Sequence, residues 1–95
     1  EAHVRDLGAA LMGRLEQLAD EYSEVFGAPR GMGLLLGLPL QPPHDVASFV
    51  NALRERGILV GSAGGNTLRF APPLIATLAH VDRVISALRV CAGSA

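Results

Sequence analysis

The sequence predicts an α+β domain, a small two-layer fold in which helices cover one face of a short, mainly antiparallel sheet of three strands. In three segments apolar residues recur at intervals of three and four, as they do on the buried face of a helix. Short apolar runs lie between these segments, and Gly and Pro separate the runs. The expected order of elements is α-β-α-β-β-α, and 95 residues form one domain of ordinary size.

The first element is expected to be a helix that begins almost at residue 1. Arg and acidic residues fall on one side, and the other side carries Val4, Leu7, Leu11, Leu15 and Leu18. No turn or capping residue precedes this helix, which indicates that the domain continues from a longer chain. The chain is expected to leave the helix at Gly27, Ala28 and Pro29.

The middle of the chain predicts one strand followed by a second helix. The apolar run 31–38 is short and rich in glycine, which favours a buried strand over a helix. A loop over 41–44 follows, and Asp45 or His44 can cap the next helix. Gly57 is expected to end that helix. Its inner face is predicted to carry Val46, Phe49, Val50 and Leu53.

Two further strands and a final helix complete the prediction. The strands are expected at 58–60 and 67–70, joined by the glycine-rich turn 61–66, and Pro72 and Pro73 are expected to end the second strand. Thr77 is placed to cap the last helix. The inward face of that helix is predicted to consist of Leu78, Val81, Ile85 and Leu88.

Composition excludes several classes of function. A net charge of −1 and a pI near 6.3 give no basic field for nucleic acid, and no apolar run approaches the roughly 20 residues that span a bilayer. His3, His44 and His80 lie on separate elements without metal-ligand spacing, so no metal site is expected. The single cysteine, Cys91, cannot form an internal disulfide, which fits a reducing compartment. A mean hydropathy of +0.34 is high for so small a domain, and it favours an apolar face that meets a partner.

Arg69 is the one residue whose chemistry conflicts with its surroundings. It lies in the apolar segment 67–74, and a guanidinium, which is always charged, needs a carboxylate or phosphate to meet it there. Either a structural ion pair within the domain or the binding of an anion would satisfy this need. All eight basic residues are Arg. A chain without lysine cannot bind a carbonyl cofactor covalently through a lysine amine.

The glycine-rich segment 61–66 is interpreted as a hairpin-like turn. The alternative is a loop that lines a neighbouring active site, because successive backbone N–H groups can hold an anion. Ser62 does not stand in the pattern of a nucleophile elbow, and no dinucleotide or P-loop motif is present. The residues alone therefore indicate no catalytic and no cofactor-binding group in this chain.

Two motifs carry a resemblance to a known family. The segment Gly65-Asn66-Thr67-Leu68-Arg69-Phe70-Ala71-Pro72-Pro73-Leu74, preceded by Arg30-Gly31-Met32-Gly33-Leu34-Leu35-Leu36-Gly37, resembles the C-terminal small domain of class III pyridoxal-phosphate-dependent aminotransferases. The likeness covers nearly all of residues 1–95 and is strongest to the acetylornithine, ornithine and succinylornithine branch.

The resemblance implies a role for Arg69 and partners for the domain. By this likeness, Arg69 would receive the α-carboxylate of the amino-acid or 2-oxo-acid substrate. The pyridoxal phosphate, its lysine and the phosphate-binding loop would belong to a large domain, and the enzyme would be a cytoplasmic homodimer in arginine biosynthesis. The chain by itself would be inactive.

Two other interpretations stay open from the sequence. A stand-alone regulatory module could bind a free amino acid through the glycine-rich turn and Arg69, and such a module would bind amino acids in calorimetry. A purely structural dimerisation domain would instead self-associate tightly without a ligand.

Overall fold

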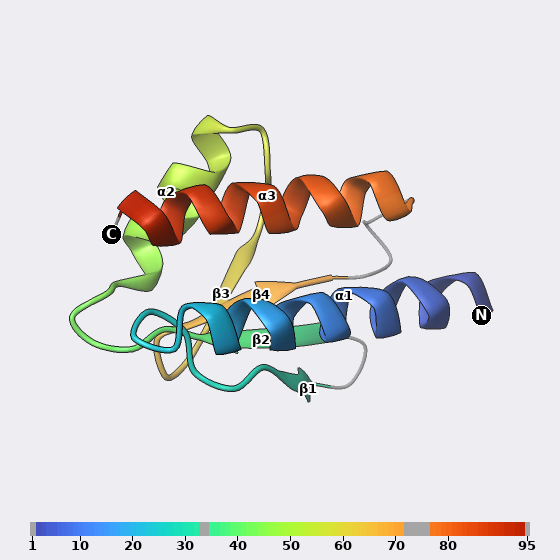
Figure 1. The fold of residues 1–95 in the computed structure, drawn as a ribbon, viewed down its shortest axis with the longest axis horizontal. Coiled ribbons are helices and arrows are strands. Elements are labelled where there is room, and N and C mark those ends of the chain that lie inside the picture. The colour runs from blue at the N-terminus through green and yellow to red at the C-terminus, as the bar shows by residue number, and fades with distance from the viewer. Residues whose placement is uncertain (1, 33–34, 72–76, 95) are drawn as a thin grey trace.

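The protein, described here by a computed structural model over residues 2–32, 35–71 and 77–94, has the expected α+β fold. Figure 1 shows its helices and its short sheet. In chain order, the elements are α1 (Ala2–Glu21), β1 (Arg30–Met32), β2 (Leu35–Pro39), α2 (Val46–Glu55), β3 (Gly61–Ala63), β4 (Thr67–Phe70) and α3 (Leu78–Ser94).

The sheet has four strands, not three, in the order β1-β2-β4-β3, and every neighbouring pair is antiparallel. The extra strand arises because the apolar run 31–38 is two strands. Gly31 pairs with Leu36 and Met32 with Leu35, so the two halves of the run bond to each other. An apolar run of this length does not reveal an internal reversal, because both strands are equally apolar.

The strand expected at 58–60 begins later, at Gly61. Residues 58–60 are not part of a strand. The Ile58 N–H instead completes the end of α2 by donating to the Leu53 carbonyl at 2.9 Å. The pairing of β3 with β4 starts at the Gly61–Arg69 pair and ends at the Ala63–Thr67 pair. The turn is therefore confined to residues 64–66, and β4 ends at Phe70. Pro72 and Pro73, expected to end that strand, lie outside the described residues.

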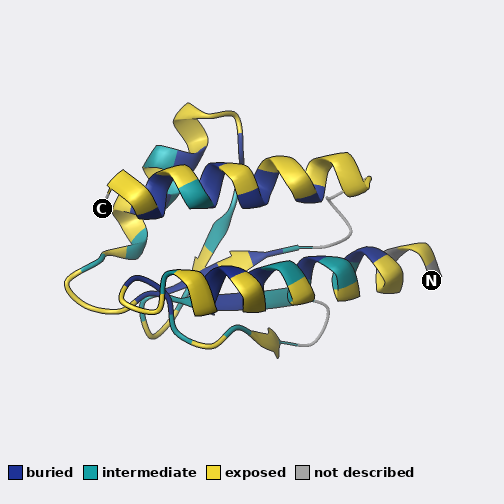
Figure 2. Ribbon diagram, in the orientation of Figure 1, coloured by how far each residue is buried: buried dark blue, intermediate teal, exposed yellow. Residues whose placement is uncertain are grey.

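The three helices form the second layer. α1 and α3 run in the same direction along the long axis of the molecule, and α2 packs against α3, β3 and β4 (Figure 1). Two exposed ion pairs, Arg14–Asp82 and Arg89–Glu21, join α1 to α3. Figure 2 shows the buried side of both helices. The core lies there, and its completely buried leucines are Leu11, Leu15, Leu18, Leu38, Leu53, Leu68 and Leu88.

The predicted inner faces of the helices are largely confirmed. Phe49 and Leu53 of α2 are buried, as are Val81, Ile85 and Leu88 of α3. Leu78 is the exception, because 62% of it is exposed. It borders a hollow that α1 lines with the small residues Ala9, Ala10 and Gly13 and with the polar Arg14 and Gln17. The α1 residues beside Leu78 are too small or too polar to bury it.

Local capping follows the sequence closely. The Asp45 side chain accepts a hydrogen bond from the Ser48 N–H at 3.2 Å, so Asp45, and not His44, caps α2. Gly57 follows α2 with a φ of +79°, a left-handed conformation that glycine adopts without strain. The Thr77 hydroxyl accepts from the His80 N–H at 3.2 Å and caps α3.

Asn66 ties the β3–β4 turn to the loop before α2. Its side-chain oxygen accepts from the Val46 N–H at 2.8 Å, and its amide donates to the carbonyls of His44 at 2.8 Å and Leu40 at 3.4 Å. Its backbone has a φ of +58°, which asparagine tolerates better than most residues. One side chain therefore fixes the start of α2 relative to β4.

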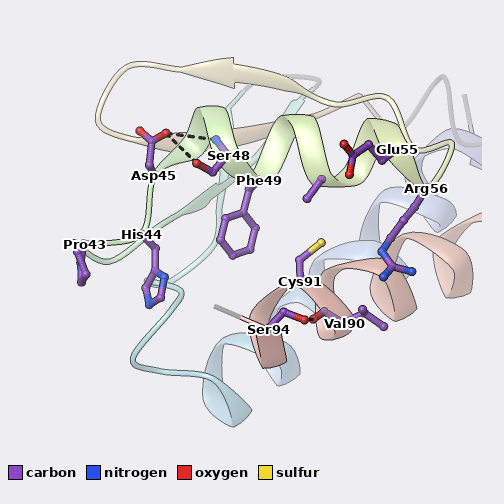
Figure 3. Close-up of a pocket in the computed structure, with 11 residues that line it drawn as sticks. Pro43, His44, Asp45, Ser48, Phe49, Glu55, Arg56, Val90, Cys91 and Ser94 are labelled. Carbon is purple, nitrogen blue, oxygen red and sulfur yellow. Dashed lines mark hydrogen bonds between the residues drawn. The ribbon is translucent and has the colours of Figure 1, made fainter.

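A cavity of about 630 Å³ lies between α2 and the C-terminal half of α3 (Figure 3). Phe49 and Cys91 line it from the two helices, and the charged residues Asp45, Glu55 and Arg56 lie around it. Burial raises the pKa of the Cys91 thiol above its usual value, and the Arg56 charge offsets only part of this rise. A thiol in such surroundings is a packing group, not an activated nucleophile.

We expect Asn66→Ala to lower the free energy of unfolding by about 2–3 kcal/mol, because it removes three hydrogen bonds and leaves a strained φ. Urea denaturation measures this loss. Asn66→Gly should lose less, since glycine adopts the same φ without strain. The exposed Asn51 of α2 supplies the control, and its alanine variant should stay within about 0.5 kcal/mol of the parent. Equal effects at Asn66 and Asn51 would contradict the role assigned to Asn66.

We expect Cys91 to react with iodoacetamide at pH 8 at least about tenfold more slowly in the folded protein than in urea-denatured protein. Its raised pKa reduces the reactive thiolate, and burial restricts access. The sign follows from the pKa: the rate in the folded protein should keep rising at pH values where the unfolded thiol is already fully ionised. Similar rates in the two states would show that the thiol is neither buried nor shifted.

Candidate functional site

Arg69 lies on β4, an inner strand of the sheet, and its side chain is exposed. The neighbouring residues Leu68 and Phe70 are buried in the core beneath the helices. Because successive residues of a strand point to opposite faces, Arg69 points to the face turned away from the helices. The apolar segment that made Arg69 anomalous is thus explained by alternation along one strand.

The strand register places Arg69 in a row that crosses the whole sheet. Arg30 of β1 pairs with Gly37 of β2, Gly37 pairs with Arg69, and Arg69 pairs with Gly61 of β3. Directly paired residues share a face, so both arginines and both glycines lie on the side away from the helices. Arg69 therefore has a residue without a side chain on each side of it.

The guanidinium of Arg69 lies over Gly61. A Cβ added at Gly61 would lie 2.7 Å from Nη2, 2.9 Å from Nε and 3.1 Å from Cζ of Arg69. The corresponding space at Gly37 is filled differently, because a Cβ there would lie 2.6 Å from Met32 Sδ and 3.1 Å from Thr67 Cγ2. The guanidinium is therefore directed toward β3, the edge strand.

A cavity of about 440 Å³ opens at this edge of the sheet. It is bordered by the segment 57–61, by the end of β4 and by the first turns of α3. Its described lining includes the cations Arg69 and Arg83, together with His80, and holds no carboxylate. A cavity with two guanidinium groups and no acid favours the binding of an anion.

The side chain of Arg69 makes no hydrogen bond or ion pair with any residue that the structure describes. Arg14 and Arg89, by contrast, each pair with an acid on a neighbouring helix. Of the two alternatives that the sequence left open for Arg69, a structural ion pair finds no support among the described residues. With respect to the described residues, the five donors of the guanidinium are all available to a group from outside.

The glycine-rich segment is a hairpin, as the favoured interpretation predicted. Ala63 pairs with Thr67 across a turn of residues 64–66, and Gly65 in that turn has a φ of +78°. The backbone N–H of Leu40 donates to the Asn66 carbonyl at 2.9 Å, so the turn is occupied by contacts within the domain.

Metal and membrane functions gain no support. No group of three or more His, Cys, Asp or Glu side chains in the described residues is arranged to hold a metal ion. The His44 ring packs edge-on against Phe49, with ring centroids 6.4 Å apart. None of the helices described, in residues 2–32, 35–71 and 77–94, has the length and apolar character that crossing a bilayer requires.

The sequence identified Arg69 but not the residues around it. Gly61, His80 and Arg83 join Arg69 only because β3 pairs with β4 and the start of α3 lies beside them. Gly61 can be placed beside Arg69 only when the register of β3 against β4 is known, and the sequence does not give that register. His80 and Arg83 have no such signal, since each is ordinary for an exposed helical position.

The comparisons with known proteins agree with this fold. A family model described as aminotransferase class-III matches residues 1–91. The acetylornithine aminotransferase of Thermosynechococcus vestitus is 40% identical over 88 residues, which cover 90% of this chain and 21% of that protein. The L-lysine-epsilon aminotransferase of Mycobacterium bovis is 37% identical over 82 residues, covering 86% of this chain and 18% of that protein.

A solved structure supports the same relationship in three dimensions. The lysine aminotransferase of M. tuberculosis superimposes with a TM-score of 0.79 at 34% identity, covering 93% of this chain and 20% of that one. The present chain thus spans about a fifth of the length of the proteins it matches. Over nearly all of its residues, the chain belongs to the class-III aminotransferase family.

Proposed function

We propose that this chain is the C-terminal, substrate-orienting small domain of a pyridoxal-phosphate-dependent aminotransferase, in which Arg69 binds the α-carboxylate of the substrate. The observation that carries the proposal is an exposed guanidinium, without a partner among the described residues, at a cavity whose described lining contains cations and no acid. Membership in the class-III family favours an enzyme domain over a stand-alone amino-acid-binding module.

The chemistry of amino transfer explains why a guanidinium would be used. The substrate would have to be held in one orientation at the cofactor, and two parallel hydrogen bonds from one guanidinium fix a carboxylate in position and in angle. A strand that is paired on both sides is a rigid support for such a group. An amino acid and a 2-oxo acid both carry a carboxylate beside the reacting carbon, so Arg69 would serve both half-reactions.

The residues of this chain do not fit covalent attachment of the cofactor, because its sequence has no lysine. In the proposal, pyridoxal phosphate is held by a large domain and supplies the electron sink for the chemistry at the substrate Cα. This chain would bind and orient the acid. The large domain and a second subunit would complete the enzyme as a cytoplasmic homodimer, consistent with a chain whose single cysteine, Cys91, is buried and free.

Within the family we propose acetylornithine and 2-oxoglutarate as the substrates, as in arginine biosynthesis. Support comes from the 40% identity to the Thermosynechococcus vestitus acetylornithine aminotransferase. The competing substrate is lysine, because the Mycobacterium bovis lysine aminotransferase is nearly as similar at 37%. Both amino acids carry the α-carboxylate that Arg69 would bind, so Arg69 does not discriminate between them.

We expect Arg69→Ala in the full-length enzyme to lower kcat/KM by about 100-fold for both the amino-acid and the 2-oxo-acid substrate, because both lose the same carboxylate partner. Arg69→Lys should recover part of the loss, since it restores the charge without the two-pronged geometry. Arg54, exposed near the end of α2, supplies the control, and Arg54→Ala should leave both values within twofold. Unchanged kinetics for Arg69→Ala with both substrates would refute the assignment.

We expect the full-length enzyme, supplied with 2-oxoglutarate, to use N-acetylornithine with a kcat/KM at least about tenfold higher than lysine or ornithine, because the proposed substrate pocket accepts the acylated side chain. Steady-state assays that follow glutamate release with each donor give the ratio directly. A preference for lysine would transfer the substrate proposal to the lysine aminotransferases without changing the role of Arg69.

A further inference from the structure

We propose that Gly61 is a positioning residue for Arg69: the missing side chain at Gly61 leaves the space in which the Arg69 guanidinium lies, and so sets the direction in which it meets a carboxylate. This inference rests on the proposed function of Arg69. It concerns a second residue, one that does not itself touch the substrate.

The register makes Gly61 the direct neighbour of Arg69. The two residues pair across β3 and β4 and lie on the same face of the sheet. A Cβ at Gly61 would lie 2.7–3.1 Å from the guanidinium atoms Nη2, Nε and Cζ of Arg69. These distances are shorter than the van der Waals contacts that a Cβ atom normally makes. Any residue other than glycine at position 61 would therefore displace the end of the arginine.

The opposite side of Arg69 offers no equivalent space. Gly37 also pairs with Arg69, but the Met32 sulfur and the Thr67 methyl occupy the volume beside it. The guanidinium thus lies over β3, at the edge of the sheet and at the cavity that Arg83 also lines. The Arg69 side chain therefore extends over Gly61, because other side chains already fill the space over Gly37.

The backbone gives no other reason for a glycine at position 61. Positive φ values among the described residues occur at Gly57, Gly65 and Asn66, and Gly61 is not one of them. Alanine therefore suits the backbone there, and the clash that it creates is with the flexible end of an arginine. The expected response to Gly61→Ala is a shifted guanidinium in an intact fold.

The test is a double-mutant cycle in the full-length enzyme with Gly61→Ala, Arg69→Ala and the combined variant. We expect Gly61→Ala to lower kcat/KM for the amino-acid substrate by about tenfold when Arg69 is present, and by less than twofold when Arg69 is alanine. Gly64→Ala, three residues along the same hairpin, is the matched control and should keep full activity, because a Cβ there meets nothing within 4 Å.

The outcomes separate this inference from the proposed function. A large loss in Arg69→Ala with none in Gly61→Ala, or equal losses from Gly61→Ala in both backgrounds, overturns the positioning role alone. Full activity in Arg69→Ala overturns both proposals. If Gly61→Ala lowers the melting temperature of the enzyme, the combined variant should restore it by removing the clash, and a failure to restore it also overturns the inference.

Discussion

The antiparallel pairing of β4 with both β2 and β3 is the constraint on which the rest of this structure depends. It fixes the alternation that buries Leu68 and Phe70 beneath the helices and sends Arg69 to the other face. A one-residue slip in register would bury the guanidinium in the core and expose both apolar side chains. The same strand register therefore determines both the burial of the core residues and the exposure of Arg69.

The features predicted correctly from the sequence are those that short stretches of chain determine. Helical periodicity predicts the buried leucines of α1. Gly57 and Thr77 are predictable as helix ends, and the cap of α2 is narrowed to Asp45 or His44, because each acts on backbone groups within a few residues. Arg69 was recognised because a charge in an apolar strand is anomalous whatever the strand pairs with. None of these inferences required knowledge of which strands are neighbours.

The features that the sequence did not reveal depend on contacts between distant segments. The fourth strand and the late start of β3 both follow from pairing partners, which an apolar run does not specify. Asn66 looked like an ordinary turn residue, yet its side chain bonds to groups 20–26 residues away. The exposure of Leu78 reflects small residues on α1, and the contact between Gly61 and Arg69 needs the register itself.

The absence of an acid beside Arg69 in the described residues has a consequence for amino transfer. An enzyme that alternates between an amino acid and a 2-oxo acid must bind and release a carboxylate in each half-reaction, so its cation must not be held permanently by an internal acid. A buried ion pair is costly to break, whereas an exposed guanidinium at a cation-lined cavity exchanges one anion for another at little cost. In the function proposed here, the balancing charge comes from the substrate, or from a large domain while the site is empty. An arginine suits that role, because its guanidinium stays charged throughout and its planar donors match each incoming carboxylate equally well.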